Sequence, residues 1–374
     1  MKITIESENL QKKLPLLNRC ISSKNQLPIL LTFLLEATGT NLEITATDLE
    51  IGIKVTIPAE IIEGGQVAVP AKVFSELINS LPSEKIELST EENQLRVRSK
   101  KTKSSFSLTD ASEFPNLYED MGKQIAKLSN TSLKKDITSV VFATSPDITR
   151  PALSGVLLKK QHEEEKETFL FVATDGYRLS LRTHPLSVGD IPFEKPLLIP
   201  SRILREVLNA KEEEGTTALF VAEQNNQVIF KMKDTILVGR LIEAVFPPYE
   251  KIIPTDFSSD VTIDREELLK AVKICSIFAR ETANVVKISL QKDKVVVLAH
   301  TPSVGENAVE VEAKLKGEEN EIAFNARYLL DLLSNVEGED VLFQMSGPLN
   351  PGLFKIVGDD NFFHIIMPIR QVQA

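Results

Sequence analysis

Two aspartates in matching surroundings are the residues of this sequence best placed to do chemistry. Asp48 follows Thr47 in the segment NLEITATDLEIG, and Asp175 follows Thr174 in the segment TFLFVATDGYRLS. A recurring aspartate can serve as a general acid or a metal ligand. Threonine and aspartate at the end of a strand can also hydrogen-bond the backbone of a turn. We favour this structural role for both residues.

The common catalytic motifs do not occur in the sequence. It has no GxxxxGK[ST] phosphate loop, no GxGxxG turn after a strand, no HExxH helix and no GxSxG elbow. The histidines do not have metal-ligand spacing, and two distant cysteines exclude a disulfide framework or a four-cysteine metal site. These residues are His162, His184, His300, His364, Cys20 and Cys275. We therefore expect no metal and no cofactor, and we favour a binding or scaffold protein over an enzyme.

Composition and charge place the chain among globular proteins. Apolar residues make up 42% and charged residues 26%. No run of eighteen apolar residues occurs, and the start MKITIESENL lacks the apolar core of a secretory signal. We therefore expect a cytoplasmic protein with no membrane contact. The formal charge of −10 argues against gripping nucleic acid by overall charge, so any DNA contact must rest on local charge.

The 374 residues contain a threefold repeat, which fits the two or three domains expected at this length. The Thr-Asp segments recur after roughly 127 residues, and a degraded third copy is KVVVLAHTPSVGENAVE, with His300-Thr301-Pro302 at the turn. A strand entering a short amphipathic helix recurs at similar intervals. Its copies are VAVPAKVFSELINSL (67–81), LLIPSRILREVLNA (197–210) and EIAFNARYLLDLLSNV (321–336).

A further helix is predicted at the start of each repeat, from Glu8, Thr131 and Asp264, with Thr131 and Asp264 as N-caps. Alternating strands with turns at residues 91–93 and at Asn225-Asn226 follow the second helices. Each repeat thus reads as strand, helix, strands, helix, strands. This order predicts an α+β fold of antiparallel sheets with two helices per domain, and we set the domains at residues 1–122, 129–253 and 258–374.

Basic residues gather on two predicted helices despite the negative charge of the chain. Residues 8–24 carry a net charge of +3 and residues 200–211 a net charge of +2. One interpretation is that these are solvated helix faces. The other is that the repeats close into a ring with helices inward and sheets outward. Contacts of the helices with phosphates would carry no sequence information, as sliding along DNA requires.

Seven short motifs, in this order and spacing, identify a family resemblance. They are LPIL (27–30), TATDLE (45–50), VPAK (69–72), ATDGYRL (173–179), FPPY (246–249), FNARYL (324–329) and MPIR (367–370). Over its whole length the chain resembles the beta subunit of bacterial DNA polymerase III, the sliding clamp. The resemblance implies three tandem DNA-clamp domains with antiparallel sheets outside and two helices per domain inside, forming a six-domain ring as a homodimer. It also implies a non-catalytic processivity factor that encircles double-stranded DNA and tethers the replicative polymerase.

The resemblance further implies a pocket for a short, hydrophobic, glutamine-led peptide from protein partners. The implied partners are the DNA polymerase III alpha subunit, the clamp loader, and other polymerases and repair proteins. The matching residues are Leu153, Thr174, Gly176, Tyr177, Arg178, Leu179, Pro247, Ile252, Asn325, Tyr328, Met367, Pro368, Ile369 and Arg370. The chain departs from the family at Tyr177, where histidine is common, at Lys251, where arginine is frequent, and in the extension 371–374.

DNA-contacting and dimer-interface residues are predicted as well. The resemblance implies DNA contacts by Lys24, Arg150 and Arg202, and helix charge adds Lys12, Lys13 and Arg205. It implies a dimer interface with Phe106 and Leu108 on one side and Ile277 and Phe278 on the other. An ordinary core position is the alternative for each of these four residues.

Two other functions stay open on the sequence alone. A scaffold or ligand-binding protein built on the same repeats would not enclose DNA, and it would be a stable monomer where the clamp predicts a dimer. An enzyme with its site near Asp175 and Arg178 would lose catalysis when these residues are changed, whereas the clamp would lose peptide binding.

Overall fold

The computed structural model describes the chain except residues 22–26, 164–165, 187–194, 211–213, 304 and 371–374, and except the side chains of residues 162, 163 and 166. Contacts divide the described chain into two compact units. The first contains residues 1–133 and 202–241, and the second contains residues 134–186, 195–201 and 242–370.

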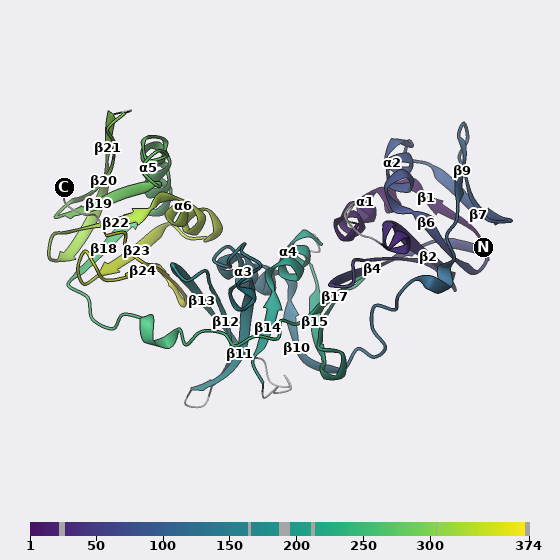
Figure 1. The fold of residues 1–374 in the computed structure, drawn as a ribbon, viewed down its shortest axis with the longest axis horizontal. Helices are drawn as coiled ribbons and strands as arrows, with labels where there is room; N and C mark the ends of the chain where they lie inside the picture. The colour runs from purple at the N-terminus through teal and green to yellow at the C-terminus, as the bar shows by residue number, and fades with distance from the viewer. Residues whose placement is uncertain (22–26, 164–165, 187–194, 211–213, 304, 371–374) are drawn as a thin grey trace. The chain divides into compact units, whose positions relative to one another are not determined.

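Helices and strands follow the order that the repeat predicts (Figure 1). The α-helices of the described chain are α1 (Ser7–Leu17), α2 (Ala71–Ser80), α3 (Asn130–Val141), α4 (Ser201–Asn209), α5 (Arg265–Phe278) and α6 (Ala326–Asn335). Each repeat contains a strand, a helix, several strands, a second helix and three closing strands. The predicted α+β architecture is therefore confirmed.

The first unit contains two antiparallel sheets. One has the order β5 (Glu60–Glu63), β1 (Lys2–Glu6), β7 (Lys85–Glu91), β8 (Gln94–Arg98) and β9 (Lys103–Ser107). The other has the order β10 (Lys123–Ser129), β15 (Thr216–Ala222), β16 (Gln227–Lys231), β17 (Thr235–Arg240), β4 (Ile51–Pro58), β3 (Asn41–Thr47), β2 (Thr32–Thr38) and β6 (Gly65–Pro70).

The second unit contains one long antiparallel run of strands. Its order begins with β14 (Leu197–Pro200), β11 (Gly155–Glu163), β12 (Lys166–Thr174), β13 (Arg178–Pro185), β25 (Asp359–Ile366) and β24 (Gly352–Ile356). It continues with β23 (Asp340–Met345), β18 (Ser259–Asp264), β21 (Gly305–Gly317), β20 (Lys294–Thr301), β19 (Val285–Gln291) and β22 (Asn320–Asn325).

Strands of neighbouring repeats pair edge to edge in both units. In the first unit β17 pairs with β4, with Gly239 opposite Ile51. In the second unit β25 pairs with β13, with Ile366 opposite Arg178. In each case the last strand of one repeat pairs with the strand that follows the Thr-Asp segment of the preceding repeat. The sheet of one repeat therefore continues into the next.

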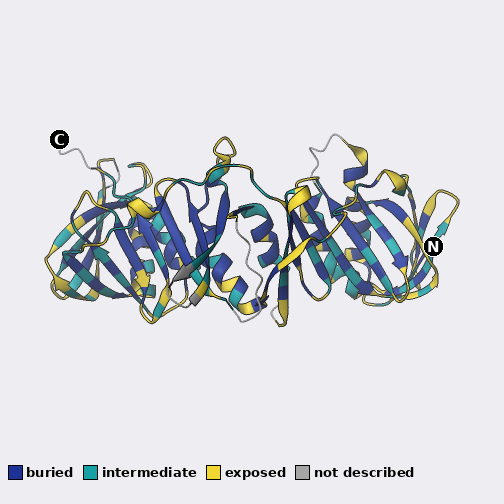
Figure 2. Cartoon of the chain, turned by 90° about the horizontal axis from the view of Figure 1, so that it is seen from below, coloured by how far each residue is buried: buried dark blue, intermediate teal, exposed yellow. Residues whose placement is uncertain are grey.

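The helices bury one face against the strands and against each other. Helix α5 buries Leu268, Ala271, Val272 and Cys275 and contacts β20 and β21. Helices α1 and α2 lie side by side, as do α5 and α6 (Figure 1). Figure 2 shows that buried residues follow the strands as well. Burying one large apolar side chain stabilises the fold by about 1.5–3 kcal/mol, so these shared cores hold the elements in place.

Local signals fix the ends of several elements. Asp264 caps α5 by accepting from the Glu267 N–H at 2.8 Å, as predicted. The prediction that Thr131 caps α3 is wrong, because α3 begins at Asn130 and Ser129 Oγ accepts from the Ser132 N–H at 3.1 Å. Asn226 has a φ of 52° at the predicted hairpin tip. Asparagine tolerates this left-handed conformation better than most residues.

Candidate binding pocket beside the second Thr-Asp turn

The two Thr-Asp segments form turns with the same hydrogen bonds. At the first turn, Thr47 Oγ1 donates to the Ile51 carbonyl at 2.8 Å and accepts from the Leu49 N–H at 3.0 Å. Asp48 Oδ1 accepts from the N–H groups of Glu50 and Ile51 at 3.1 and 2.9 Å. These bonds satisfy backbone groups that the turn would otherwise leave unpaired.

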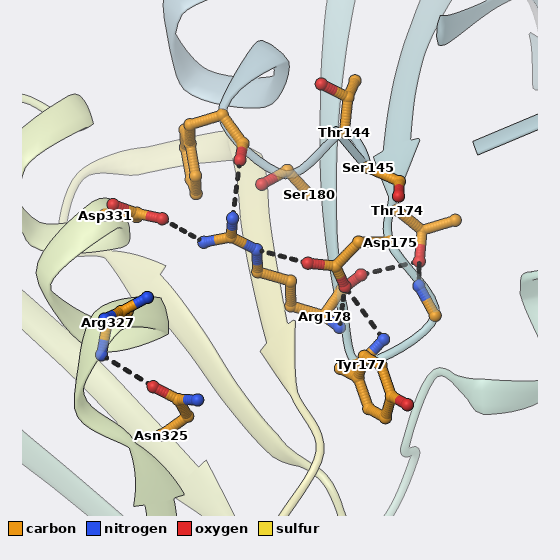
Figure 3. Close-up of polar contacts among 12 residues, drawn as sticks. Thr144, Ser145, Thr174, Asp175, Tyr177, Arg178, Ser180, Asn325, Arg327 and Asp331 are labelled. Atoms are coloured by element: carbon orange, nitrogen blue, oxygen red, sulfur yellow. Dashed lines mark hydrogen bonds and ion pairs between the residues drawn. The ribbon is translucent and has the colours of Figure 1, made fainter. Parts of the chain in front are cut away.

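The second turn repeats this pattern bond for bond. Thr174 Oγ1 donates to the Arg178 carbonyl at 2.6 Å and accepts from the Gly176 N–H at 3.0 Å. Asp175 Oδ1 accepts from the N–H groups of Tyr177 and Arg178 at 2.9 and 3.1 Å. Asp175 Oδ2 accepts from Arg178 Nε at 3.0 Å, so both carboxylate oxygens have partners (Figure 3). The structural interpretation of Asp48 and Asp175 is therefore confirmed.

A cavity of about 190 Å³ lies beside the second turn. Predicted pocket residues that line it are Thr174, Gly176, Arg178, Leu179, Pro247, Ile252 and Met367. Pro248, Tyr249 and Ile365 also line it and are not among the residues predicted from the sequence. The floor belongs to an apolar cluster that includes Leu179, Tyr249 and Ile365. The cavity is thus apolar with a few polar groups at its edge, which is typical of a site for a small apolar ligand or peptide.

Two phenols near the cavity have raised pKa values. Burial and, to a smaller extent, the neighbouring Glu250 together raise the pKa of Tyr249 to about 12. Burial also raises the pKa of Tyr328, with a contribution from the charge of Asp175. Both phenols therefore keep their protons at neutral pH, which fits binding better than proton transfer.

Three further predicted pocket residues do not line this cavity. Leu153 is buried, and its carbonyl accepts from the Ser145 N–H at 2.8 Å. Tyr177 is 59% exposed, and its carbonyl accepts from the Met367 N–H at 2.8 Å. Asn325 caps α6 by accepting from the Arg327 N–H at 3.0 Å (Figure 3). Its side chain therefore has a structural role at the start of this helix.

The C-terminal residues of the predicted pocket extend away from the cavity. Pro368 is half-buried, and the Ile369 N–H donates to the Ala323 carbonyl at 2.8 Å, along β22. Ile369 and Arg370 line a larger hollow of about 930 Å³, together with residues of β19, β20 and β21. Those predicted pocket residues that line a depression are therefore distributed over two depressions of the second unit.

At the first turn a side chain of the chain itself takes the corresponding place. Gly52 stands where the second turn has Leu179, five residues after the threonine in each case. A Cβ added to Gly52 would lie 2.3 Å from Leu117 Cδ2. Leu117 belongs to the segment FPNLYE, which resembles FPPYE around Tyr249. Leu117 therefore packs over the first turn much as Tyr249 packs over the second.

Comparison with known proteins decides the family. Models of the DNA polymerase III beta subunit match residues 1–118 (N-terminal domain), 127–248 (central domain) and 250–370 (C-terminal domain). The beta sliding clamp of Staphylococcus aureus strain Mu50 is 30% identical over 99% of each chain. The chain belongs to the DNA polymerase III beta subunit family. It is a sliding clamp with three tandem clamp domains.

Other relatives agree with this assignment along the whole chain. The beta sliding clamp of Bacillus subtilis strain 168 is 29% identical, over 99% of this chain and 100% of the relative. The crystal structure of the DNA polymerase sliding clamp from Bacillus subtilis has a TM-score of 0.92 at 28% identity, with both chains covered completely. The fold class predicted from the sequence, three clamp domains of antiparallel sheets with two helices each, is therefore confirmed.

Of the predicted DNA-contacting residues of this clamp, some have a polar or charged partner within the chain and others are exposed. Lys12 pairs with Glu8 at 2.6 Å, and Lys13 Nζ donates to Thr235 Oγ1 at 3.4 Å. Arg202 Nη2 lies 2.5 Å from Asp48 Oδ2, so an aspartate of the first turn holds it. Two others are exposed, namely Arg205 on α4 and Arg150, whose guanidinium lies beside Gly176 at the cavity edge. Lys24 lies outside the described residues.

The predicted interface residues of the clamp occupy strand-edge and helix-end positions. Phe106 is buried on the edge strand β9, with its ring 5.8 Å from that of Phe74. Leu108 follows β9 and is half-buried. Ile277 is 54% exposed at the end of α5, and Phe278 beside it is half-buried. Ile277 is thus not an ordinary core residue, whereas Phe106 contributes to the core of its own domain.

The part of the chain that the structure describes contains neither a metal-binding cluster nor a membrane-spanning helix. Within it, no group of three or more histidine, cysteine, aspartate or glutamate side chains is arranged to hold a metal ion. The helices of the described residues include none that is long and apolar enough to cross a membrane.

Proposed function

We propose that two copies of this sliding clamp close head to tail into a six-domain ring that encircles duplex DNA, with helices lining the bore and sheets outside. In this function the chain catalyses no reaction. It is a processivity factor that keeps the replicative polymerase on DNA by enclosure, so its DNA contacts need no sequence specificity. The pairing rule of the strand edges is the observation that carries this proposal.

Both junctions within the chain obey that rule. The last strand of one repeat (β17 or β25) pairs with the strand after the Thr-Asp turn of the preceding repeat (β4 or β13). The last strand of the first repeat is β9, which lies at the edge of its sheet. The strand that follows the third, degraded copy of the Thr-Asp segment is β21. Residues 305–312 of β21 pair with β20 on one side, and the described chain offers no strand on the other. A second copy completes the series if its β9 pairs with this edge, which gives a head-to-tail contact.

Charge on the two edges supports this pairing. Strand β9 begins at Lys103, shortly after the exposed Lys100 and Lys101. The first part of β21 carries the exposed residues Glu306 and Glu310. Opposite charges across paired strands stabilise them, whereas two β9 edges or two β21 edges would repel each other. The interface would also contain Phe106 and Leu108 of one copy and Ile277 and Phe278 of the other.

The ring is tested by sedimentation velocity with charge-reversed variants. The wild-type chain should sediment near twice 41.6 kDa. Lys103→Glu and Glu306→Lys should each shift the equilibrium toward monomer. In an equal mixture, a heterodimer has one contact with both charges reversed and one wild-type contact, so the mixture should recover the dimer. Lys85→Glu, on β7 of the same sheet as β9, is the matched control and should stay dimeric. A wild-type chain that is monomeric at all concentrations contradicts the proposal.

Enclosure of DNA is tested by retention on circular and linear duplexes. After loading by the clamp loader, the ring should stay on a closed circle and slide from the ends of a linear duplex. The proposed phosphate contacts are Lys12, Lys13, Lys24, Arg150, Arg202 and Arg205. Loss of a phosphate contact should weaken binding uniformly across sequences. Equal dissociation from circles and linear duplexes would contradict enclosure.

For partner binding, we propose that the cavity beside the second turn receives a short, glutamine-led apolar peptide. Such peptides would come from the DNA polymerase III alpha subunit, the clamp loader, and other polymerases and repair proteins. The apolar floor and small size of the cavity support one or two apolar side chains as its contents. The predicted residues outside the cavity lining, including Pro368, Ile369 and Arg370, would contact flanking parts of the partner.

Fluorescence anisotropy with a labelled peptide of one glutamine followed by leucine and phenylalanine residues tests the cavity. Ile252→Arg should abolish binding and leave the dimer intact, because it places a charge in an apolar space. Val357→Arg replaces another exposed apolar residue outside the cavity lining and is the matched control. Unchanged affinity of Ile252→Arg would exclude this cavity as the peptide site.

A further inference from the structure

Arg178 joins three elements around the cavity through one guanidinium. Its side chain is 8% exposed. Nε donates to Asp175 Oδ2 at 3.0 Å in its own turn, and Nη2 donates to the carbonyl of Phe142, just after α3, at 2.8 Å. Nη1 donates to Asp331 Oδ2 on α6 at 2.7 Å (Figure 3). A planar guanidinium held at all three nitrogens has one orientation.

Helix α6 approaches this guanidinium at two points. Asp331 meets its edge, and the ring of Tyr328 meets its face, with the guanidinium carbon 4.6 Å from the ring centre. The two residues are three positions apart in α6, so they lie on the same side of the helix. A stacked cation and an ion pair from one helix therefore fix the position of that helix relative to the second turn.

We propose that Asp331 is a positioning residue for the partner pocket. It does not line the cavity, and its side chain is 46% exposed. It acts through Arg178, which does line the cavity, and it holds Tyr328 against that arginine. This inference rests on the proposed peptide-binding function of the cavity.

Replacing Asp331 by asparagine removes a negative charge from the surroundings of the Arg178 guanidinium. An amide at position 331 can still accept a hydrogen bond, but it brings no charge to a buried cation. Of the two carboxylates that pair with Arg178, Asp175 and Asp331, the variant keeps Asp175. The guanidinium gains freedom to move toward Asp175, and the face presented to Tyr328 and to the cavity changes with it.

Arg182 offers a matched control four residues further along β13. Its Nε donates to Asp136 Oδ1 at 2.7 Å, and its Nη1 donates to Asp359 Oδ2 at 2.9 Å on β25. This ion pair also links the central domain to the C-terminal domain, and neither Arg182 nor Asp359 lines the cavity. Asp359→Asn therefore weakens the same domain junction without touching the Arg178–Tyr328 pair.

The experiment compares Asp331→Asn, Asp331→Glu and Asp359→Asn in the full-length dimer. Peptide affinity is measured by anisotropy with the labelled peptide described above, alongside thermal unfolding. Asp331→Asn should weaken peptide binding about five- to tenfold, which is less than the loss of a whole charged hydrogen bond because the amide still accepts one. Asp331→Glu, which keeps the charge, should recover part of this loss. Asp359→Asn should lower the unfolding temperature and leave affinity within about twofold.

A second measurement does not depend on the peptide. The chain has four tyrosines, so fluorotyrosine labelling gives a simple ¹⁹F spectrum in which Tyr328→Phe assigns the Tyr328 signal. Asp331→Asn should shift this signal, and Asp359→Asn should not. If Asp331→Asn leaves the Tyr328 signal unmoved, the inference about Asp331 is wrong, whether or not the wild-type chain binds the peptide. If the wild-type chain binds no peptide, the proposed pocket is wrong, which is a separate result. Equal loss of peptide affinity in Asp331→Asn and Asp359→Asn also overturns the inference about Asp331, because the effect would then come from the junction.

Discussion

The first and second Thr-Asp turns share their backbone hydrogen bonds but differ in the arginine that the aspartate holds. Asp48 Oδ2 pairs with Arg202 of α4, whose side chain is 42% exposed. Asp175 Oδ2 pairs with the buried Arg178 of its own turn. The side chain over the turn also differs, since Leu117 packs on Gly52, whereas Tyr249 packs beside Leu179 at a cavity. The Thr-Asp pair thus determines the turn, and residues outside the pair determine whether a pocket forms beside it.

The largest expected difference between the turns is electrostatic. Asp175→Asn keeps an oxygen for the backbone N–H groups but removes charge from the buried Arg178, so it should cost about 3 kcal/mol of unfolding free energy. Asp48→Asn is the matched variant at the first turn and should cost under about 1 kcal/mol, because solvent screens the exposed Arg202. Urea unfolding measures both values. Equal costs would show that burial of the arginine does not distinguish the turns.

Removing the hydrogen bonds of the threonine hydroxyl should lower the unfolding free energy equally at the two turns. Thr47→Val and Thr174→Val each remove one donated and one accepted hydrogen bond at a buried site. Each should lower the unfolding free energy by about 2 kcal/mol, since buried backbone groups lose their partners. Urea unfolding of both variants checks this. A difference of more than about 1 kcal/mol between them would mean that the two networks are not equivalent.

Substitutions at the third residue of each turn should change the stability of the chain slightly and in opposite directions. Leu49 has a φ of 76° and Gly176 a φ of 93°, a region that favours glycine. Leu49→Gly should therefore stabilise the chain by up to about 1 kcal/mol by relieving strain. Gly176→Ala should destabilise it by about the same amount, although the added Cβ would lie 3.6 Å from Arg150 and meets no clash. Thermal unfolding that shifts both variants in the same direction would contradict this account.

Local patterns explain why so much of the fold was predictable. The Thr-Asp turns, the hairpin at Asn226 and the Asp264 cap each depend on neighbours in the sequence, and the structure confirms them. The wrong cap of α3 has the same origin, because the run Ser129-Asn130-Thr131-Ser132 offers several similar candidates. The predicted domain limits at 1–122, 129–253 and 258–374 stay a prediction.

The site was only partly predictable because its parts meet in tertiary structure. Tyr249 and Ile365 come from a connecting segment and from β25, and no local pattern links them to the second turn. Asp331 and Phe142 reach Arg178 from two different helical regions. The family motif MPIR named a continuous run, yet Met367 lines one depression and Ile369 the other. Sequence proximity therefore did not indicate which residues share a surface.

The edge-to-edge pairing of β17 with β4 and of β25 with β13 has a mechanical consequence for the proposed ring. Both pairings connect strands of one continuous chain, so a junction that breaks re-forms quickly because its halves stay tethered at high local concentration. The contact between copies would have similar strand pairing without a tether. Under an outward force the proposed ring would therefore open at the seam between copies. In the proposed ring, the strand pairing that closes each junction would thus also determine where the ring opens.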